Sequence, residues 1–385
     1  MAPIDSLPNE LLIAILEQAD APALVLRRPD TTAYASCLVS RQWRECAQPL
    51  LWRSLALRGR NALRAVLDSG AALSYLAKVR SLSVECVDGM EDEAAELLRH
   101  LGTVEEVRIN HSHTFPFATL THLKHLRVEG VSLTELGLLP AFPSLRSLVL
   151  SWTRIPLSTA RDFFTPAKLP TLKNLAFSEL ERFPTSSDDE PETLGEILSL
   201  DFAARLDIVQ LQLDRSCTAI RDCAALVGDA SDEDDSDAAD GAARPLNNVL
   251  VTLETEHLRL AYSMSDFLCD VEHLCLEPRE AEDGRIYTGD FTTGEEDFTF
   301  LSVLRRCTSL RTLLLPLEFS TSPLADLSLA RYLDEILAAC PVKDVEVIWA
   351  DRPFREYEWG PVLREEFARW VRRQRGEQGS QEERG

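Results

Sequence analysis

The first part of the chain carries apolar side chains at the spacing of amphipathic helices. One stripe comprises Leu11, Leu12, Ile15 and Leu16. A second helix is predicted from Tyr34 through Cys37 and Leu38, and Ser40 is placed to cap a third. Three helices this short cannot bury all their apolar faces among themselves. The surplus predicts either a protein partner or docking onto the rest of the chain.

From Val79 onward the chain repeats the pattern apolar-x-x-apolar-x-apolar. Its first copies are Val79/Leu82/Val84, Val104/Val107/Ile109, Leu123/Leu126/Val128, Leu145/Leu148/Leu150 and Leu172/Leu175/Phe177. The later copies are Ile208/Leu211/Leu213, Leu246/Val249/Val251, Val271/Leu274/Leu276, Leu310/Leu313/Leu315 and Val342/Val345/Val347. The first five copies start 19 to 27 residues apart, which fits one strand and one returning segment per repeat. A solenoid is therefore predicted.

Helical stretches precede several of these predicted strands and stop at a breaker residue. They comprise Ala94, Leu97, Leu98 and Leu101 before Gly102, and Leu333, Ile336 and Leu337 before Pro341. Because helix and strand alternate, the stacked strands should be parallel. The fold class expected is α/β, with a short three-helix N-terminal domain followed by an irregular solenoid.

The composition along the chain predicts its segments. These are the N-terminal helices at 1–56, the repeats at 57–350, a capping helix at 351–373 and a disordered tail at 374–385. The capping helix carries an apolar stripe through Leu363, Phe367, Trp370 and Val371 and should cover the last strand. Acidic insertions with few large apolar residues are expected to be mobile at 184–193, 229–245 and 278–297. Their serines, such as Ser231, suit an acidophilic kinase, although a purely solvating role fits equally well.

The net charge and the cysteines of the chain limit the classes of partner and the cellular locations that we expect. The formal net charge of −23 disfavours a nucleic-acid partner. The nine cysteines form no C-x-x-C pair and no dense framework, so we expect reduced thiols in an intracellular protein. The acidic start and the lack of a long uncharged apolar stretch disfavour secretion and membrane insertion. A cytoplasmic or nuclear location is expected.

Three segments near the N-terminus carry a family resemblance. They are Leu7-Pro8-Asn9-Glu10-Leu11-Leu12, Val39-Ser40-Arg41-Gln42-Trp43-Arg44 and Pro49-Leu50-Leu51-Trp52-Arg53-Ser54-Leu55. In this order they resemble an F-box, in the form common among fungal F-box proteins. The interval from Glu17 to Cys37 is longer than is usual in that family, which leaves the geometry between the first two helices open.

The resemblance implies that this segment docks on the Skp adaptor of a Skp-cullin-F-box ubiquitin ligase, and so joins a cullin-RING complex. The adaptor-binding residues it implies are Leu7, Pro8, Leu11, Ile15, Leu38, Val39, Trp43 and Leu51. The remainder of the chain would hold an unknown protein substrate, with no catalysis and no cofactor of its own. The alternative is that such residues pack the helices onto the first repeat, which we expect of Leu12, Leu16, Leu50 and Trp52.

The repeats resemble degenerate leucine-rich repeats, and the closest local match lies at residues 306–313. The asparagine or cysteine that this family places after the strand is missing. In six repeats a basic residue follows the first apolar position: Arg80, Lys124, Arg146, Lys173, Arg311 and Lys343. This row can form a substrate-binding stripe for an acidic or phosphorylated segment, with Arg80, Lys124, Arg146 and Lys173 as its main residues. The favoured alternative is that these exposed strand positions carry lysine and arginine for solubility alone.

Motifs for catalysis are missing from the sequence. It contains no phosphate-binding loop, dinucleotide fingerprint, nucleophile elbow or zinc-protease helix. The pairs His111/His113 and His122/His125 lack neighbouring ligands for a metal, and the second pair falls in and before a predicted strand, so a solvated position is expected rather than a metal site. Two alternatives to a ligase receptor stay open: an adaptor-bound scaffold, and a repeat protein whose N-terminal helices only cap the solenoid. An enzyme of unrecognised type is a more distant one.

Overall fold

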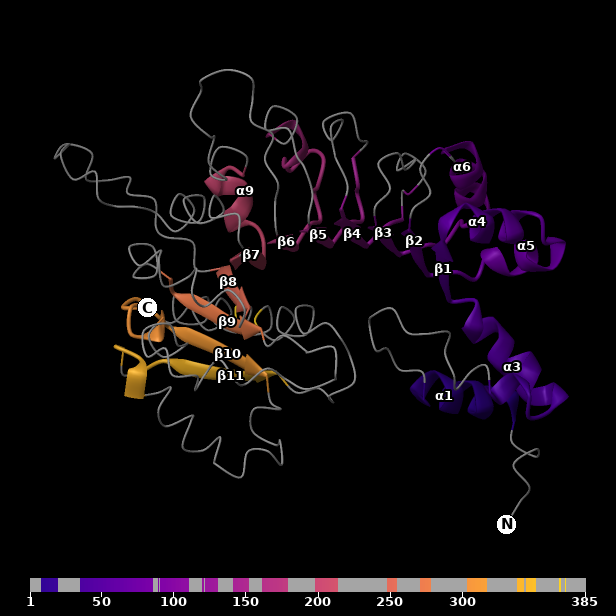
Figure 1. The fold of residues 1–385 in the computed structure, drawn as a ribbon, viewed down its shortest axis with the longest axis horizontal. Coiled ribbons are helices and arrows are strands. Elements are labelled where there is room, and N and C mark those ends of the chain that lie inside the picture. Colours follow the sequence, from indigo (N-terminus) through magenta and orange to yellow (C-terminus); the bar gives the residue numbers. More distant parts are fainter. Residues whose placement is uncertain are drawn as a thin grey trace, which may run out of the picture. The chain divides into compact units, whose positions relative to one another are not determined.

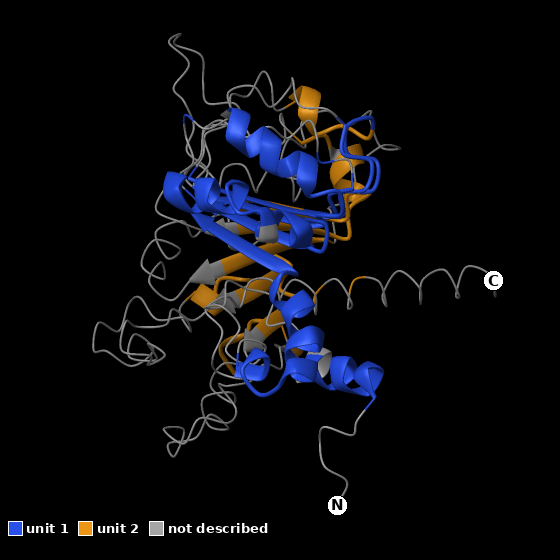
Figure 2. Cartoon of the chain, turned by 90° about the vertical axis from the view of Figure 1, so that its right-hand side faces the viewer, with its two compact units in different colours: residues 1–147, 167–171 blue, residues 148–166, 172–385 orange. Residues whose placement is uncertain are grey.

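The computed structural model of this chain describes residues 8–19, 35–85, 89, 91–110, 120, 122–130, 141–151, 161–178, 198–213, 248–254, 271–277, 303–316, 338–342, 344–350, 367 and 371. The chain forms two compact units, shown in blue and orange in Figure 2. Unit 1 comprises residues 1–147 and 167–171, and unit 2 comprises residues 148–166 and 172–385. Each unit is described separately.

Unit 1 begins with helices α1 (Asn9–Ala19) and α3 (Arg41–Leu51), and residues 35–37 between them are also helical. Ser40 has an extended backbone and its Oγ accepts the Trp43 N–H at 3.3 Å, so its predicted capping role is confirmed. The helices share one buried cluster: Leu12, Leu16, Cys37, Cys46, Ala47 and Leu50. The prediction that Leu38 belongs to the second helix is wrong, because residues 38–39 form a turn.

Unit 1 continues with four parallel strands that pair in sequence order. They are β1 (Ser54–Arg58), β2 (Ser81–Glu85), β3 (Glu106–Asn110) and β4 (His125–Glu129), and the helices between them are α4 (Gly59–Leu67), α5 (Gly70–Leu76) and α6 (Glu91–His100) (Figure 1). The helix predicted before Gly102 is confirmed as α6, and its leucines Leu97 and Leu98 are buried.

The sequence reading missed strand β1, although the same motif marks it. Trp52, Leu55 and Leu57 have the apolar-x-x-apolar-x-apolar spacing. Leu55 pairs with Leu82 and Leu57 with Val84, so β1 adds a repeat before the first predicted one. It runs across residue 56, where the N-terminal domain was expected to end.

Unit 2 contains further parallel strands. They are β5 (Ser147–Ser151), β6 (Asn174–Ser178), β7 (Ile208–Leu213), β8 (Val249–Glu254), β9 (His273–Glu277), β10 (Thr312–Pro316) and β11 (Glu346–Ala350), and helix α9 (Leu200–Ala204) precedes β7. From β6 to β11 each strand pairs in parallel with the next one in sequence. The prediction of an α/β fold with parallel strands, as in a solenoid, is confirmed.

The pairing register matches the aligned motif copies in β2 to β4 and from β9 to β10. In the pairs β6–β7, β7–β8, β8–β9 and β10–β11 it is displaced by two residues. Leu175 pairs with Val209 where the motif predicts Leu211, and Leu313 pairs with Val347 where it predicts Val345. The copy at Leu246 is displaced in the same way relative to β9, and the copy at Val342 relative to β10. A two-residue slip keeps every side chain on its face of the sheet, so the apolar pattern alone cannot exclude it.

Hydroxyl and amide side chains join successive repeats. Thr103 Oγ1 donates to the Ala77 carbonyl at 2.9 Å, and Thr171 Oγ1 donates to the Leu145 carbonyl at 2.9 Å. The buried amide of Asn248 donates to two carbonyls of the preceding repeat, those of Ala203 and Leu206, each at 2.9 Å. These side chains satisfy the hydrogen-bonding capacity of turn carbonyls. They lie at other positions of the repeat than the asparagine or cysteine of the leucine-rich-repeat pattern.

Several predictions fall on residues outside those that the structure describes. They concern the acidic insertions at 184–193, 229–245 and 278–297, the tail at 374–385, the apolar residues Leu333, Ile336 and Leu337, and the pair His111/His113. Of the predicted capping helix, Phe367 and Val371 are described, and both are helical and buried. None of the described helices has the length and apolar character needed to cross a membrane.

Candidate functional site

Helix α1 carries two apolar stripes that differ in exposure. Leu12 and Leu16 are buried in the cluster shared with α3. Leu11 and Ile15 are 53% and 50% exposed. Since the two exposed residues are four positions apart, they lie on the same face of the helix. This face of α1 is therefore apolar and open.

The turn before α3 presents two more exposed apolar side chains. Leu38 is 66% exposed and Val39 is 59% exposed. Their backbone N–H groups donate to the carbonyls of residues 35 and 36, at 3.0 and 3.1 Å. Arg44 Nε also donates to the Cys37 carbonyl at 3.1 Å. The turn is thus held by hydrogen bonds in a shape that points apolar side chains outward.

A side-chain bond joins the two elements that carry these residues. Gln42 Nε2, in the first turn of α3, donates to Asn9 Oδ1 at the start of α1, at 2.9 Å. The 38–39 turn and the first turns of α1 therefore lie at the same end of the helix pair. Among the described residues, the large apolar side chains that are exposed are Leu11, Ile15, Leu38 and Val39. We call these four the exposed apolar surface; patches of this kind mark interaction sites.

The other predicted adaptor-binding residues lie around this surface. Pro8 is exposed, whereas Trp43 and Leu51 are half-buried against the shared cluster. Leu7 lies outside the described residues. The Trp43 indole Nε1 is buried, and no described residue accepts its hydrogen bond.

The four residues expected to pack onto the first repeat divide into two groups. Trp52 packs onto the first repeat as expected, because its ring stacks on that of Tyr75 in α5. The ring centroids are 5.5 Å apart and the ring planes are within 10° of parallel. For Leu12, Leu16 and Leu50 the expectation is wrong, because they are buried between α1 and α3. Helices α1 and α3 bury these leucines by packing against each other. The sequence analysis did not consider this possibility.

The comparison with protein families bears on this helix pair. Residues 4–58 match the F-box-like family. The chain carries an F-box-like domain at its N-terminus. The match ends with strand β1, so the strands from β2 onward lie beyond it. A search among curated proteins found no match for the chain.

The exposed apolar surface lies entirely within the F-box-like domain. Domains of this family typically occur in non-catalytic subunits of ubiquitin ligases, where they bind the Skp adaptor. The buried cluster provides a rigid base for the surface, and burial raises the pKa of the Cys37 and Cys46 thiols within it. These thiols stay protonated near neutral pH and contribute only packing.

The basic residues of the predicted row lie just before the strand of their repeats. Acidic residues occupy the equivalent position in the repeats between them. The Arg80 guanidinium is 3.3 Å and the Lys124 ammonium 3.1 Å from the carboxylate of Glu105, which occupies the same position in the repeat between them. The Lys124 hydrogen bond, helped by the charges of Lys124 and Arg80, holds the pKa of Glu105 below its usual value. The sequence reading noted the basic residues and missed Glu105.

In unit 2 the same alternation recurs. Lys173 lies 4.0 Å from Asp207, and Arg311 lies 3.3 Å from Glu272. Burial raises the pKa of Glu272, and the Arg311 charge opposes that rise. Arg146 is exposed, and its backbone N–H donates to the Lys124 carbonyl. Arg80, Lys124, Lys173 and Arg311 therefore form a ladder of ion pairs between repeats, while Arg146 is exposed and Lys343 lies outside the described residues.

A second polar group lies on the strands of unit 1, opposite their buried leucines and valines. Arg108 Nη2 is 2.8 Å and Arg127 Nη2 is 3.5 Å from the same carboxylate oxygen of Glu129. Arg108 Nε also donates to Asn110 Oδ1 at 3.1 Å. Arg108 and Arg127 occupy x positions of the motif in β3 and β4, and Asn110 and Glu129 follow its last apolar position; all four are half-buried, and the sequence analysis left them aside. They give this face of the sheet fixed hydrogen-bonding groups.

Proposed function

We propose that this protein is a non-catalytic substrate receptor of a Skp-cullin-F-box ubiquitin ligase. The exposed apolar surface of the F-box-like domain carries the proposal. Leu11, Ile15, Leu38 and Val39 would bind the Skp adaptor, with Pro8, Trp43, Leu51 and Leu7 extending the contact. The strands after the domain would hold the protein to be ubiquitinated, and other subunits would perform the transfer.

Burial energetics support an adaptor at this surface. Fully burying a leucine, isoleucine or valine side chain is worth roughly 1.5–3 kcal/mol. Since the four residues are already about half covered, an interface here would gain several kcal/mol in total. Contacts of that size are typical of the few residues that dominate a protein interface.

Charged side chains on the faces of the strands support the receptor role. Arg108, Arg127 and Glu129 offer charged donors and acceptors in a fixed arrangement on the β3–β4 face. The role of Arg80, Lys124, Arg146 and Lys173 in substrate binding stays a prediction, and Glu105 and Asp207 reduce the net positive charge beside three of them. An acidic substrate segment would have to compete with these carboxylates.

Co-expression of the full chain with a Skp adaptor, followed by size-exclusion chromatography, tests the adaptor step. We expect a 1:1 complex with the unmodified chain and its loss in the double variant Leu11→Ala/Ile15→Ala. The matched control is Ala65→Ser, an exposed change on α4. Retention of the complex by the double variant, with unchanged thermal stability, would overturn the assignment of this surface.

The solenoid-cap alternative makes the opposite prediction for the same variant. If α1 only covered the repeats, Leu11→Ala/Ile15→Ala would lower stability and affect no partner. The half-exposed state of both side chains argues against a covering role. An adaptor-bound scaffold without a ligase would show the complex, yet no protein bound to its repeats would accumulate on proteasome inhibition.

A further inference from the structure

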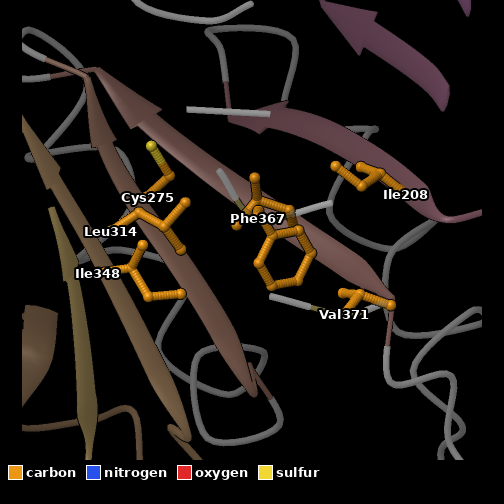
Figure 3. Close-up of a cluster of buried hydrophobic side chains, with 7 residues drawn as sticks. Ile208, Cys275, Leu314, Ile348, Phe367 and Val371 are labelled. Atoms are coloured by element: carbon orange, nitrogen blue, oxygen red, sulfur yellow. The ribbon is translucent and has the colours of Figure 1, made fainter. Parts of the chain in front are cut away.

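Two described residues near the C-terminus, Phe367 and Val371, lie against one face of the unit 2 sheet. Phe367 and Val371 are helical and are 0% and 1% exposed. They form a buried cluster with side chains from successive strands: Ile208, Leu250, Cys275, Leu314 and Ile348 (Figure 3). The capping helix was expected to cover the last strand. The cluster of its described residues includes Ile348 of β11, the last strand, and extends back to Ile208 of β7.

This covered face carries an unusual number of polar side chains. Gln210, Thr252, His273 and Thr312 are each at most 6% exposed, and by strand alternation they share the face with the cluster. Gln210 Nε2 donates to Thr252 Oγ1 at 2.7 Å, and His273 Nδ1 lies 2.7 Å from Thr312 Oγ1. The His273 ring also contacts the Phe367 ring, with centroids 5.0 Å apart.

A sheet face that is permanently buried is ordinarily an almost continuous apolar surface. Here the buried polar side chains lose their hydration, and that loss opposes burial. Gln210 Oε1 is buried, and no described residue donates a hydrogen bond to it. An amphipathic helix binds a hydrophobic groove through apolar anchors three or four positions apart, which is the spacing of Phe367 and Val371.

We propose that this face is a docking groove for a partner's amphipathic helix, and that the C-terminal segment around Phe367 and Val371 occupies it in cis as an autoinhibitory contact. The partner helix would carry an aromatic residue and a β-branched residue four positions apart, like Phe367 and Val371. The proposal deepens the receptor function proposed above by naming the class of segment that the repeats bind.

Occupation in cis has a direct consequence for affinity. A partner binds only the fraction of molecules in which the groove is open, so its apparent dissociation constant rises by the inverse of that fraction. Weakening the contacts of Phe367 and Val371 should open the groove and so lower the partner's apparent dissociation constant. Competition between the segment and a partner helix is therefore measurable without knowing the natural partner.

Cys275 provides a built-in reporter of groove opening. It forms no disulfide with another described cysteine, it is 0% exposed, and it belongs to the same buried cluster as Phe367 (Figure 3). In the full-length double variant Phe367→Ala/Val371→Ala we expect a maleimide to label Cys275 at least tenfold faster than in the unmodified chain. Cys307 and Cys46, which are buried elsewhere, report global unfolding and should keep their rates. Phe163→Ala, a buried aromatic of the same unit, is the matched control and should leave Cys275 protected.

A peptide with the sequence of residues 360–376 tests the groove in trans. We expect it to restore protection of Cys275 in the double variant, and to bind that variant at least tenfold more tightly than the unmodified chain. The same peptide with alanine at positions 367 and 371 should do neither. An unchanged Cys275 rate, equal acceleration of Cys307 and Cys46, or failure of the peptide to protect would each overturn the proposal. No adaptor is present in these measurements, so such a failure would leave the adaptor step of the proposed function standing.

Discussion

At the residue scale, similar apolar side chains on one helix have different surroundings. Leu11 and Leu12 are neighbours in the sequence, yet Leu12 is 1% exposed and Leu11 is 53% exposed. The helical stripe predicted which residues are apolar. It could not separate the stripe that meets α3 from the one left open, because both have the same spacing. Only the packing of α1 against α3 makes that distinction.

Alanine substitutions at these two positions should have unequal effects on folding. We expect Leu12→Ala to lower the free energy of unfolding by about 2–5 kcal/mol, because it leaves a cavity in the shared cluster. Leu11→Ala should change it by about 0.5 kcal/mol or less, since that side chain is mostly solvated. Urea denaturation of the full chain measures both. Equal losses would show that α1 is packed in a different orientation.

At the element scale, the sequence predicted the strands better than their pairing. The motif located the strands from β2 onward because alternating burial requires its spacing. It left the register open to two-residue slips, as at Leu175 and Val209, because such slips preserve the buried face. Strand β1 was missed because its residues had been assigned to the N-terminal helical domain. Glu105 was missed because its partners come from neighbouring repeats 19 to 25 residues away.

The ion-pair ladder between repeats should make a small, pH-dependent contribution to stability. The pKa of Glu105 is lowered in the folded state by Lys124 and Arg80. Its carboxylate therefore stabilises the fold above its unfolded pKa of about 4.3, and this contribution is lost as the pH falls through the lower folded-state pKa. Because the pairs are well exposed, we expect Glu105→Gln to cost at most about 1 kcal/mol at pH 7.

The cost of the same substitution should shrink between pH 7 and about pH 2, as the carboxyl becomes protonated first in the unfolded and then in the folded state. Glu96→Gln, at an exposed position on α6, is the control for removing a surface charge. Thermal denaturation of both variants at the two pH values checks the prediction. A Glu105→Gln cost that persists in acid would mean that the side chain acts through packing and not through its charge.

At the scale of the whole molecule, the chain combines one family-matched domain with a long repeat region that the match does not cover. The formal charge of −23 is spread over a protein whose described exposed large apolar side chains all lie in the F-box-like domain. An acidic surface opposes non-specific association, so an apolar contact confined to one domain favours a specific partner there. Under the proposed function, the strand faces and the C-terminal contact would serve a different partner, the protein to be bound.

Hydrogen–deuterium exchange of the full chain, with and without a Skp adaptor, tests the central claim most directly. We expect the adaptor to slow exchange of the backbone amides in α1 and in residues 35–40, which carry Leu11, Ile15, Leu38 and Val39. Amides of β3 and β4 should keep their rates and serve as the internal control. Protection at the N-terminal helices would establish the adaptor contact; no protection there, or protection of the strands instead, would contradict it.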